Sequence, residues 1–326
     1  MSATLVVGGT GLLGFHTVTE LLERGHDVTS LALPGAPDGL LPERVEAVWG
    51  NLEEMPDEDV LALLDGKHAV FYAIGADERT TPPAPAAHFF YEANVRSTQR
   101  LARLARRAGV RKLVVFGSYT AQFAQEYTDI PYAANGYPRT RLAQEEIAEL
   151  EGIGAMDVMT LRLPYIFGLV AGQRPLWQFV LDVVASQQPV VAVPAGSTSS
   201  VTARQVGRAA VGAMEHGTHG GRYPINAYDL GYAELHRLAC EAIGRDPRDV
   251  VVAPKEAFLP AFAQIDAQTA AAGLEHGIHM VDTAEFQARD AVSDPGLSSV
   301  LGMGDDDVPA AIRETFAWCV AHPATA

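Results

Sequence analysis

The sequence predicts an α/β protein built on a doubly wound parallel sheet, with helices covering both of its faces. Short apolar and β-branched runs alternate with longer amphipathic patterns through the first half of the chain. A glycine-rich turn joins the first of these runs to the first helical pattern. The runs are separated by helix-length connections, which parallel strands need for their crossovers, so we expect a parallel sheet between two layers of helices.

The expected elements of the first half follow one another in βαβ order. Apolar residues share one face of the first helical pattern, and Gly25 ends it. Strands are predicted over 4–7, 26–33, 45–49, 69–73, 112–116 and 156–163, and helices over 12–24, 59–64, 87–108 and 137–150. Residues 1–163 are therefore assigned to the sheet domain.

The alternation loosens after residue 163, where Gly, Pro and Ser become frequent. A smaller α/β region that binds the substrate is expected over 164–326, with a strand near 222–226 returning to the main sheet. Its predicted helices span 177–185, 203–215, 232–243 and 309–320. The acidic run 305–307 precedes the last of these, where negative charge favours the helix dipole, so it indicates a helix start rather than a metal site.

Composition and charge narrow the possible partners. The 326 residues are 48% hydrophobic and 20% charged, which is typical of a globular protein. A formal net charge of -16 argues against nucleic acid as the main partner. Cys240 and Cys319 are too few for a disulfide framework and are expected to be buried thiols. With no basic leader and no apolar run of membrane length, we expect a cytoplasmic protein that acts on a small molecule away from membranes.

The glycine-rich turn Gly8-Gly9-Thr10-Gly11-Leu12-Leu13-Gly14 predicts a dinucleotide site. It directly follows a predicted strand and opens a predicted helix, which is the context that gives such a pattern its meaning. The first glycine permits the tight turn, the second lets a pyrophosphate approach the backbone, and the third lets helix and strand pack closely. Residues 1–163 would then form an NAD(P)-binding domain of the Rossmann type. The predicted cofactor contacts of the turn are Gly8, Thr10, Gly11, Leu12, Leu13 and Gly14.

Further segments accompany this turn at the positions expected for one family. Gly50-Asn51-Leu52 and Ala73-Ile74-Gly75 follow two predicted strands, Asn94-Val95-Arg96-Ser97-Thr98 lies in the long helix, and residues 110–118 and 161–168 complete the set. Over about residues 3–226 the chain resembles extended or atypical short-chain dehydrogenase/reductase proteins, the branch with NAD-dependent epimerases and dehydratases. The resemblance implies a homodimer. It also implies cofactor contacts from Leu33, Asn51, Leu52, Ala73, Ile74, Gly75, Tyr137, Arg141, Pro164 and Ile166.

The family's catalytic signature, Tyr-x-x-x-Lys, corresponds here to Tyr137 and Arg141. The two residues share a helix face, and a cation beside the phenol would lower the pKa of Tyr137 by favouring the phenolate. Arginine supplies the charge without lysine's compact ammonium group, so activity is expected but not implied by the signature. Two alternatives are an ordinary buried tyrosine at 137 and a surface salt bridge between Arg141 and Glu145.

The hydroxyl that accompanies the tyrosine in this family has three candidates here. The resemblance places Tyr119 at the usual Ser/Thr position, while Ser118 or Thr120 could take its role. Asn94 matches a family asparagine that supports a proton relay, and a plain helix asparagine is the alternative.

The sequence leaves the choice between NAD and NADP open. An acidic side chain at the end of the second strand favours NAD, and a nearby arginine favours NADP. This chain has Ala32 and Leu33 there, so the predicted cofactor is written NAD(P). His276 and His279 lie around a glycine rather than at the spacing of a zinc helix, which predicts a loop.

Three functions are compatible with these observations. The leading prediction is an NAD(P)-dependent reductase or dehydrogenase acting on a small carbonyl or alcohol. The second is a nucleotide-sugar epimerase or dehydratase that retains NAD, and the third is a non-catalytic protein that senses a dinucleotide or binds a partner.

Overall fold

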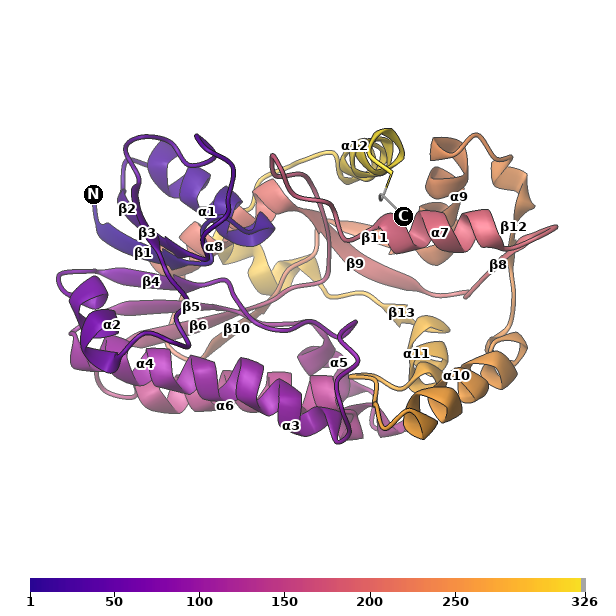
Figure 1. Ribbon diagram of the computed structural model, residues 1–326, viewed down its shortest axis with the longest axis horizontal. Helices are drawn as coiled ribbons and strands as arrows, with labels where there is room; N and C mark the ends of the chain where they lie inside the picture. Colours follow the sequence, from indigo (N-terminus) through magenta and orange to yellow (C-terminus); the bar gives the residue numbers. More distant parts are fainter. Residues whose placement is uncertain (324–326) are drawn as a thin grey trace.

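A computed structural model describes residues 1–323 and contains one large parallel sheet with the strand order β10-β6-β5-β4-β1-β2-β3 (Figure 1). Every neighbouring pair in it is parallel. The predicted fold class is therefore confirmed. The strands are β1 (Ala3–Val7), β2 (Asp27–Ala32), β3 (Glu46–Trp49), β4 (Ala69–Tyr72), β5 (Lys112–Phe116), β6 (Asp157–Arg162) and β10 (Gly221–Pro224).

Helices cover both faces because alternate strand side chains point in opposite directions. Val6 of β1 packs in one core cluster with α1 (Leu12–Glu23) and α8 (Ala203–His216). Its neighbours Leu5 and Val7 pack in another cluster, on the opposite face. The helices of that second face are α2 (Asp57–Leu64), α4 (Ser97–Arg107) and α6 (Gly136–Gly152).

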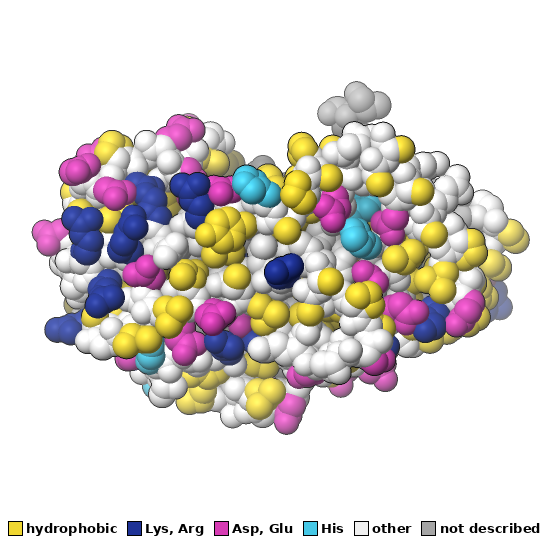
Figure 2. All heavy atoms as spheres, turned by 90° about the horizontal axis from the view of Figure 1, so that it is seen from below, with side chains coloured by type: hydrophobic (Ala, Val, Ile, Leu, Met, Phe, Trp, Pro, Cys, Tyr) yellow, Lys and Arg dark blue, Asp and Glu magenta, His cyan; other side chains and the backbone are white. Residues whose placement is uncertain are grey.

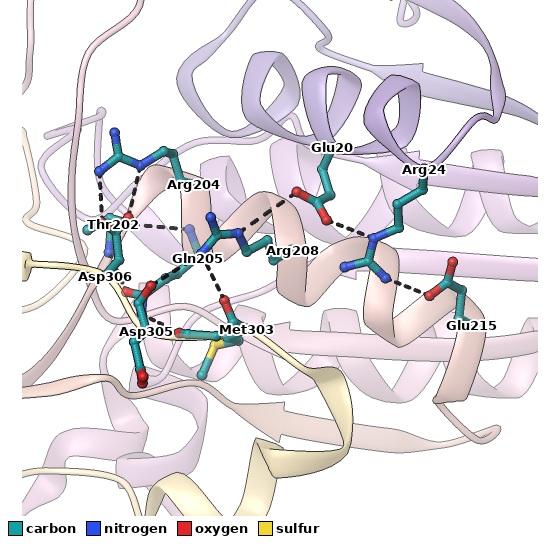
Figure 3. Close-up of polar contacts among 11 residues, drawn as sticks. Glu20, Arg24, Thr202, Arg204, Gln205, Arg208, Glu215, Met303, Asp305 and Asp306 are labelled. Carbon is teal, nitrogen blue, oxygen red and sulfur yellow. Dashed lines mark hydrogen bonds and ion pairs between the residues drawn. The ribbon is translucent and has the colours of Figure 1, made fainter.

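The helix that follows the glycine turn, α1, is held firmly by α8. The two helices approach so closely that a Cβ on Gly207 would lie 2.5 Å from the carbonyl oxygen of His16. At the rim, Arg24 pairs with Glu20 at 2.7 Å and with Glu215 at 2.6 Å (Figure 3). These contacts fix α1 against α8 from its second turn to its C-terminal end.

The acidic run before the last helix forms a helix start, as predicted. Asp307 caps α12 (Val308–Ala321) by accepting a hydrogen bond from the N–H of Ala310 at 2.8 Å. Asp306 accepts hydrogen bonds from Thr202 and Arg204 (Figure 3), so the run also ties the C-terminal helix to the start of α8.

The helix predicted over 87–108 is correct in extent but is not one regular helix. It consists of α3 (Ala86–Phe90), a π-helical segment at Tyr91–Arg96, and α4. Wide π-helical turns are frequent at functional sites, and this one contains Asn94.

Exposed arginines gather on α4, at one end of the face that Figure 2 shows. They are Arg103, Arg106 and Arg107, with Arg96 just before the helix. Arg106 and Arg107 lie in the final turn of α4, where positive charge favours the helix dipole. Since α4 ends shortly before β5 begins, Arg106 and Arg107 lie toward the amino ends of the strands.

The C-terminal half adds smaller sheets and helices beside the main sheet (Figure 1). Its apolar cluster includes Cys240 and Cys319, which are free and buried as predicted. No helix within residues 1–323 is both long and apolar enough to cross a bilayer. The strands of these smaller sheets are β7 (Tyr165–Phe167), β8 (Val191–Val193), β9 (Ser197–Thr202), β11 (Tyr228–Gly231), β12 (Val250–Val252) and β13 (Asp290–Ala291). The helices of this half, besides α8 and α12, are α7 (Gln178–Ser186), α9 (Tyr232–Ala242), α10 (Leu259–Ala271) and α11 (Met280–Gln287). In the first half, the short helix α5 (Thr120–Glu126) follows β5.

Candidate functional site

The glycine turn leaves open backbone at the start of α1. Gly8 follows β1 with φ +89°, and a Cβ on Gly14 would lie 2.1 Å from the carbonyl oxygen of Gly8. Both positions therefore require glycine. A Cβ on Gly11 would meet nothing closer than the Gly8 carbonyl oxygen at 3.4 Å, and no side chain of residues 1–323 caps the helix there. Free N–H groups at a helix start suit a phosphate, so the turn fits a dinucleotide.

The chain leaving β4 passes close to this turn and is held by Asn94. The Asn94 amide accepts from the N–H of Ala76 at 2.9 Å and donates to its carbonyl oxygen at 3.1 Å. Gly75 has φ +145°, and a Cβ there would lie 2.6 Å from the Asn94 oxygen. Asn94 thus orients the turn after β4.

Tyr137 and Arg141 meet on the buried face of α6. Both side chains are at most 6% exposed, and the guanidinium carbon lies 5.0 Å from the centre of the phenol ring. Arg141 donates to Gln144 at 2.7 Å and to the carbonyl oxygen of Ala76 at 3.1 Å. Its Nε is buried and has no hydrogen-bond partner within the described residues. A buried donor without a partner fits a cofactor hydroxyl at this position.

The alternative salt bridge between Arg141 and Glu145 is wrong. Glu145 pairs instead with Arg162 of β6, at 2.9 Å from Nε and 2.8 Å from Nη2, and both side chains are buried. Arg141 points to the other side, toward the turn after β4.

Opposing effects set the acidity of the phenol. Burial raises the pKa of Tyr137, and the nearby carboxylate of Glu78 acts in the same direction. The charge of Arg141 and the Ser118 hydroxyl oppose this by stabilising the phenolate, which lowers the pKa of Tyr137.

The structure distinguishes among the three candidate hydroxyls. Ser118 is the one beside Tyr137, and its Oγ accepts from Thr120 Oγ1 at 2.9 Å. The Tyr119 hydroxyl instead accepts from Thr198 at 3.1 Å, and its ring packs against Phe123. The geometry therefore favours Ser118 as the hydroxyl beside Tyr137, and the roles of the three hydroxyls stay predictions.

The other predicted cofactor residues lie where strands end at the same edge of the sheet. Leu33 follows β2 and is 61% exposed, whereas Leu52 is buried in the core and Asn51 accepts from the N–H of Glu53 at 3.1 Å. Ala73, Ile74 and Gly75 follow β4, Pro164 follows β6, and Ile166 lies just beyond it in β7. Ligands of open α/β sheets bind at this edge.

Several residues near the site were not predicted. Gln173 donates to the carbonyl oxygen of Thr10, which places the segment after β7 over the glycine turn. Gln144 accepts a hydrogen bond from Arg141, and the charge of Glu78 raises the pKa of Tyr137. Single polar residues at such positions form no recognisable sequence pattern.

His276 and His279 lie in a loop, as predicted. This loop contacts the site, because the N–H of Tyr137 donates to the carbonyl oxygen of Gly277. Asp266 pairs with His276 at 3.1 Å and Glu275 with His279 at 3.2 Å. Within residues 1–323, no group of three or more His, Cys, Asp or Glu side chains is arranged to hold a metal ion.

Comparison with known proteins identifies the family. The model of the NAD dependent epimerase/dehydratase family matches residues 4–225, and the chain belongs to this family. Sterol demethylase protein B of Methylococcus capsulatus is 27% identical over 275 residues, which is 77% of this chain and 78% of that protein. The sterol-4-alpha-carboxylate 3-dehydrogenase, decarboxylating, of Mus musculus is 30% identical over 148 residues, 43% of this chain but only 38% of that protein.

Solved structures agree on the fold. The UDP-glucose 4-epimerase from Bifidobacterium longum, in complex with NAD+ and UDP, matches with a TM-score of 0.69 at 16% identity and covers 99% of both chains. The predicted family and an NAD-type cofactor are thereby confirmed, because the family is NAD dependent. Among the proteins named here, the Mus musculus relative is a dehydrogenase and the Bifidobacterium longum protein is an epimerase. The choice between NAD and NADP and the homodimer stay predictions.

Proposed function

We propose that this member of the NAD dependent epimerase/dehydratase family is an NAD(P)-dependent oxidoreductase that interconverts a small carbonyl compound and its alcohol. One observation carries the proposal: Tyr137, Arg141 and Ser118 converge at the sheet edge that also bears the glycine turn. The bound nicotinamide would supply or accept the hydride at the substrate carbon.

The chain's own residues would handle the proton. In the reductive direction, Tyr137 donates its hydroxyl proton to the carbonyl oxygen, and Arg141 stabilises the phenolate that is left. In the oxidative direction the phenolate takes the proton from the alcohol. Because burial raises the pKa of Tyr137, the phenol is protonated at neutral pH, which suits reduction.

Ser118 is suited to hold the carbonyl oxygen. Its Oγ accepts from the N–H of Thr120 at 3.2 Å and from Thr120 Oγ1 at 2.9 Å. With these two acceptor positions filled, the Ser118 proton is left for donation toward the substrate beside Tyr137. Arg141 would use its unpartnered Nε for the cofactor ribose.

The test combines turnover and cofactor binding. Loss of nicotinamide absorbance from NADH or NADPH is followed with a panel of aldehydes and ketones, and binding is measured by nicotinamide fluorescence. Tyr137→Phe should reduce turnover by about a hundredfold or more while NAD(P)H binding is retained. Tyr91→Phe makes the same chemical change on the surface and is the matched control.

Unchanged turnover in the Tyr137→Phe variant would remove this tyrosine from the mechanism. If native mass spectrometry of the purified protein shows bound NAD, an epimerase is favoured instead. If the protein binds the cofactor but turns over no compound of the panel, the non-catalytic alternative is favoured.

A further inference from the structure

The segment 275–282, from the C-terminal half, holds the start of the helix that carries Tyr137. The N–H of Tyr137 donates to the carbonyl oxygen of Gly277 at 2.9 Å. Asn135, just before α6, accepts at Oδ1 from the N–H of His279 at 2.8 Å and donates from Nδ2 to Asp282 Oδ2 at 2.8 Å. Two regions far apart in sequence therefore meet at the first turn of α6.

The use of Asn135 here is unusual for its position. An asparagine before a helix ordinarily accepts a hydrogen bond from an N–H of that helix's first turn. Asn135 makes no such bond with α6, because its side chain is turned toward segment 275–282. The N–H of Tyr137 is satisfied by Gly277 instead. The start of α6 thus depends on a segment from outside the helix.

The contact with Tyr137 is close and buried. A Cβ on Gly277 would lie 3.1 Å from the Cβ of Tyr137 and 2.7 Å from the ring of Phe90. The Phe90 ring packs edge-on against the phenol at 5.3 Å. Asn135 is 3% and Asp282 8% exposed. A displacement of this segment would therefore be transmitted directly to the phenol.

We infer that Asp282 is a positioning residue for Tyr137. By fixing Asn135, it holds the first turn of α6 so that the phenol stays beside Ser118 and Arg141. The inference rests on the proposed catalytic role of Tyr137, and it adds that the site is complete only while segment 275–282 is docked. A purely structural role for Asp282, confined to the packing of α10 and α11, is the competing explanation.

Amide hydrogen exchange of the NADH-loaded protein separates the two explanations without requiring turnover. Asp282→Ala removes the shortest hydrogen bond that the Asn135 amide donates, while its bond to the carbonyl oxygen of Tyr132 at 3.1 Å remains. Exchange at the Tyr137 N–H should then accelerate about tenfold relative to the rest of α6. Asp282→Asn keeps an acceptor oxygen and should exchange like the native protein. Glu285→Ala is the matched control, because Glu285 lies on α11 like Asp282 and the variant breaks its ion pair with Lys255, away from Asn135.

Turnover provides the second readout. Asp282→Ala should lower kcat by about tenfold to a hundredfold through misplacement of the phenol, with the KM for NADH unchanged, and Asp282→Asn should restore it. Gly277→Ala, which presses on Tyr137 from the same side, should reproduce the effect if Asp282→Ala does not fold.

The inference would be overturned if the Tyr137 N–H exchanged no faster in Asp282→Ala than in Glu285→Ala. Failure of Tyr137→Phe to affect turnover would overturn the proposed function alone, since the exchange result stands independently.

Discussion

Replacing Arg141 with glutamine should raise the pKa of Tyr137 and slow alcohol oxidation at neutral pH. The guanidinium carbon lies 5.0 Å from the centre of the phenol ring. With the ring centre taken as the position of the phenolate charge, two unit charges at that separation interact by about 3 kcal/mol in an effective dielectric of about 20, which corresponds to roughly two pKa units. Burial already raises the pKa of Tyr137, so loss of the opposing cation moves it further in the same direction.

The pKa of Tyr137 can be measured directly by NMR of protein labelled with ¹³Cζ-tyrosine, with the resonance assigned through Tyr137→Phe. Arg141→Lys keeps the charge and should leave the pKa close to the native value. In the oxidative direction, where the phenolate is the base, the rise of activity with pH should shift upward in Arg141→Gln. A Tyr137 pKa in Arg141→Gln equal to or below the native value would refute the reasoning.

Three further changes test other parts of the site and core. Glu78→Gln removes a charge that raises the pKa of Tyr137, so the same NMR titration should show that pKa falling; a rise would contradict the assignment. Gly11→Ala meets no close contact, so the melting temperature should hold while NAD(P)H affinity falls about tenfold or more, as titration would show; unchanged affinity would place the phosphates elsewhere. Arg162→Met removes both hydrogen bonds of buried Glu145 to a cation and leaves it the longer contact with Arg222 at 3.6 Å, which should lower the free energy of unfolding in urea by about 3–5 kcal/mol. Arg248→Met in an exposed pair should change it little; similar effects would be evidence against the buried pair.

Local patterns predicted the main sheet well because its strands and helices have strong periodicity. The inner strands β1, β4 and β5 are almost continuous buried apolar runs, and the helix after the glycine turn has one apolar face. The smaller sheets were not predicted, since strands as short as β13 carry too few residues for a period. Helix α10 was not predicted, because its apolar residues do not gather on one face and none of its residues is buried.

The candidate site was predictable where family motifs exist and not where tertiary contacts decide. Spacing along one helix placed Tyr137 and Arg141 together. It could not show that Glu145 pairs with Arg162, because β6 lies beside α6 only in the folded protein. Nor could alignment exclude Tyr119, since the direction of its hydroxyl depends on Thr198 in β9.

The arginine that replaces the family's lysine is accommodated by its surroundings. Its planar group donates to Gln144 and to the carbonyl oxygen after β4, so those contacts fix its position beside the phenol. A lysine side chain carries one nitrogen, which could not reach both the Gln144 oxygen and the carbonyl oxygen of Ala76. It would also lack the second, unpartnered donor that Arg141 has in its Nε. Because Asn94 holds the same peptide group, the cation, the turn after β4 and the phenol form one connected unit. The arginine therefore supplies the charge that the chemistry needs and also helps to fix the cofactor edge of the sheet.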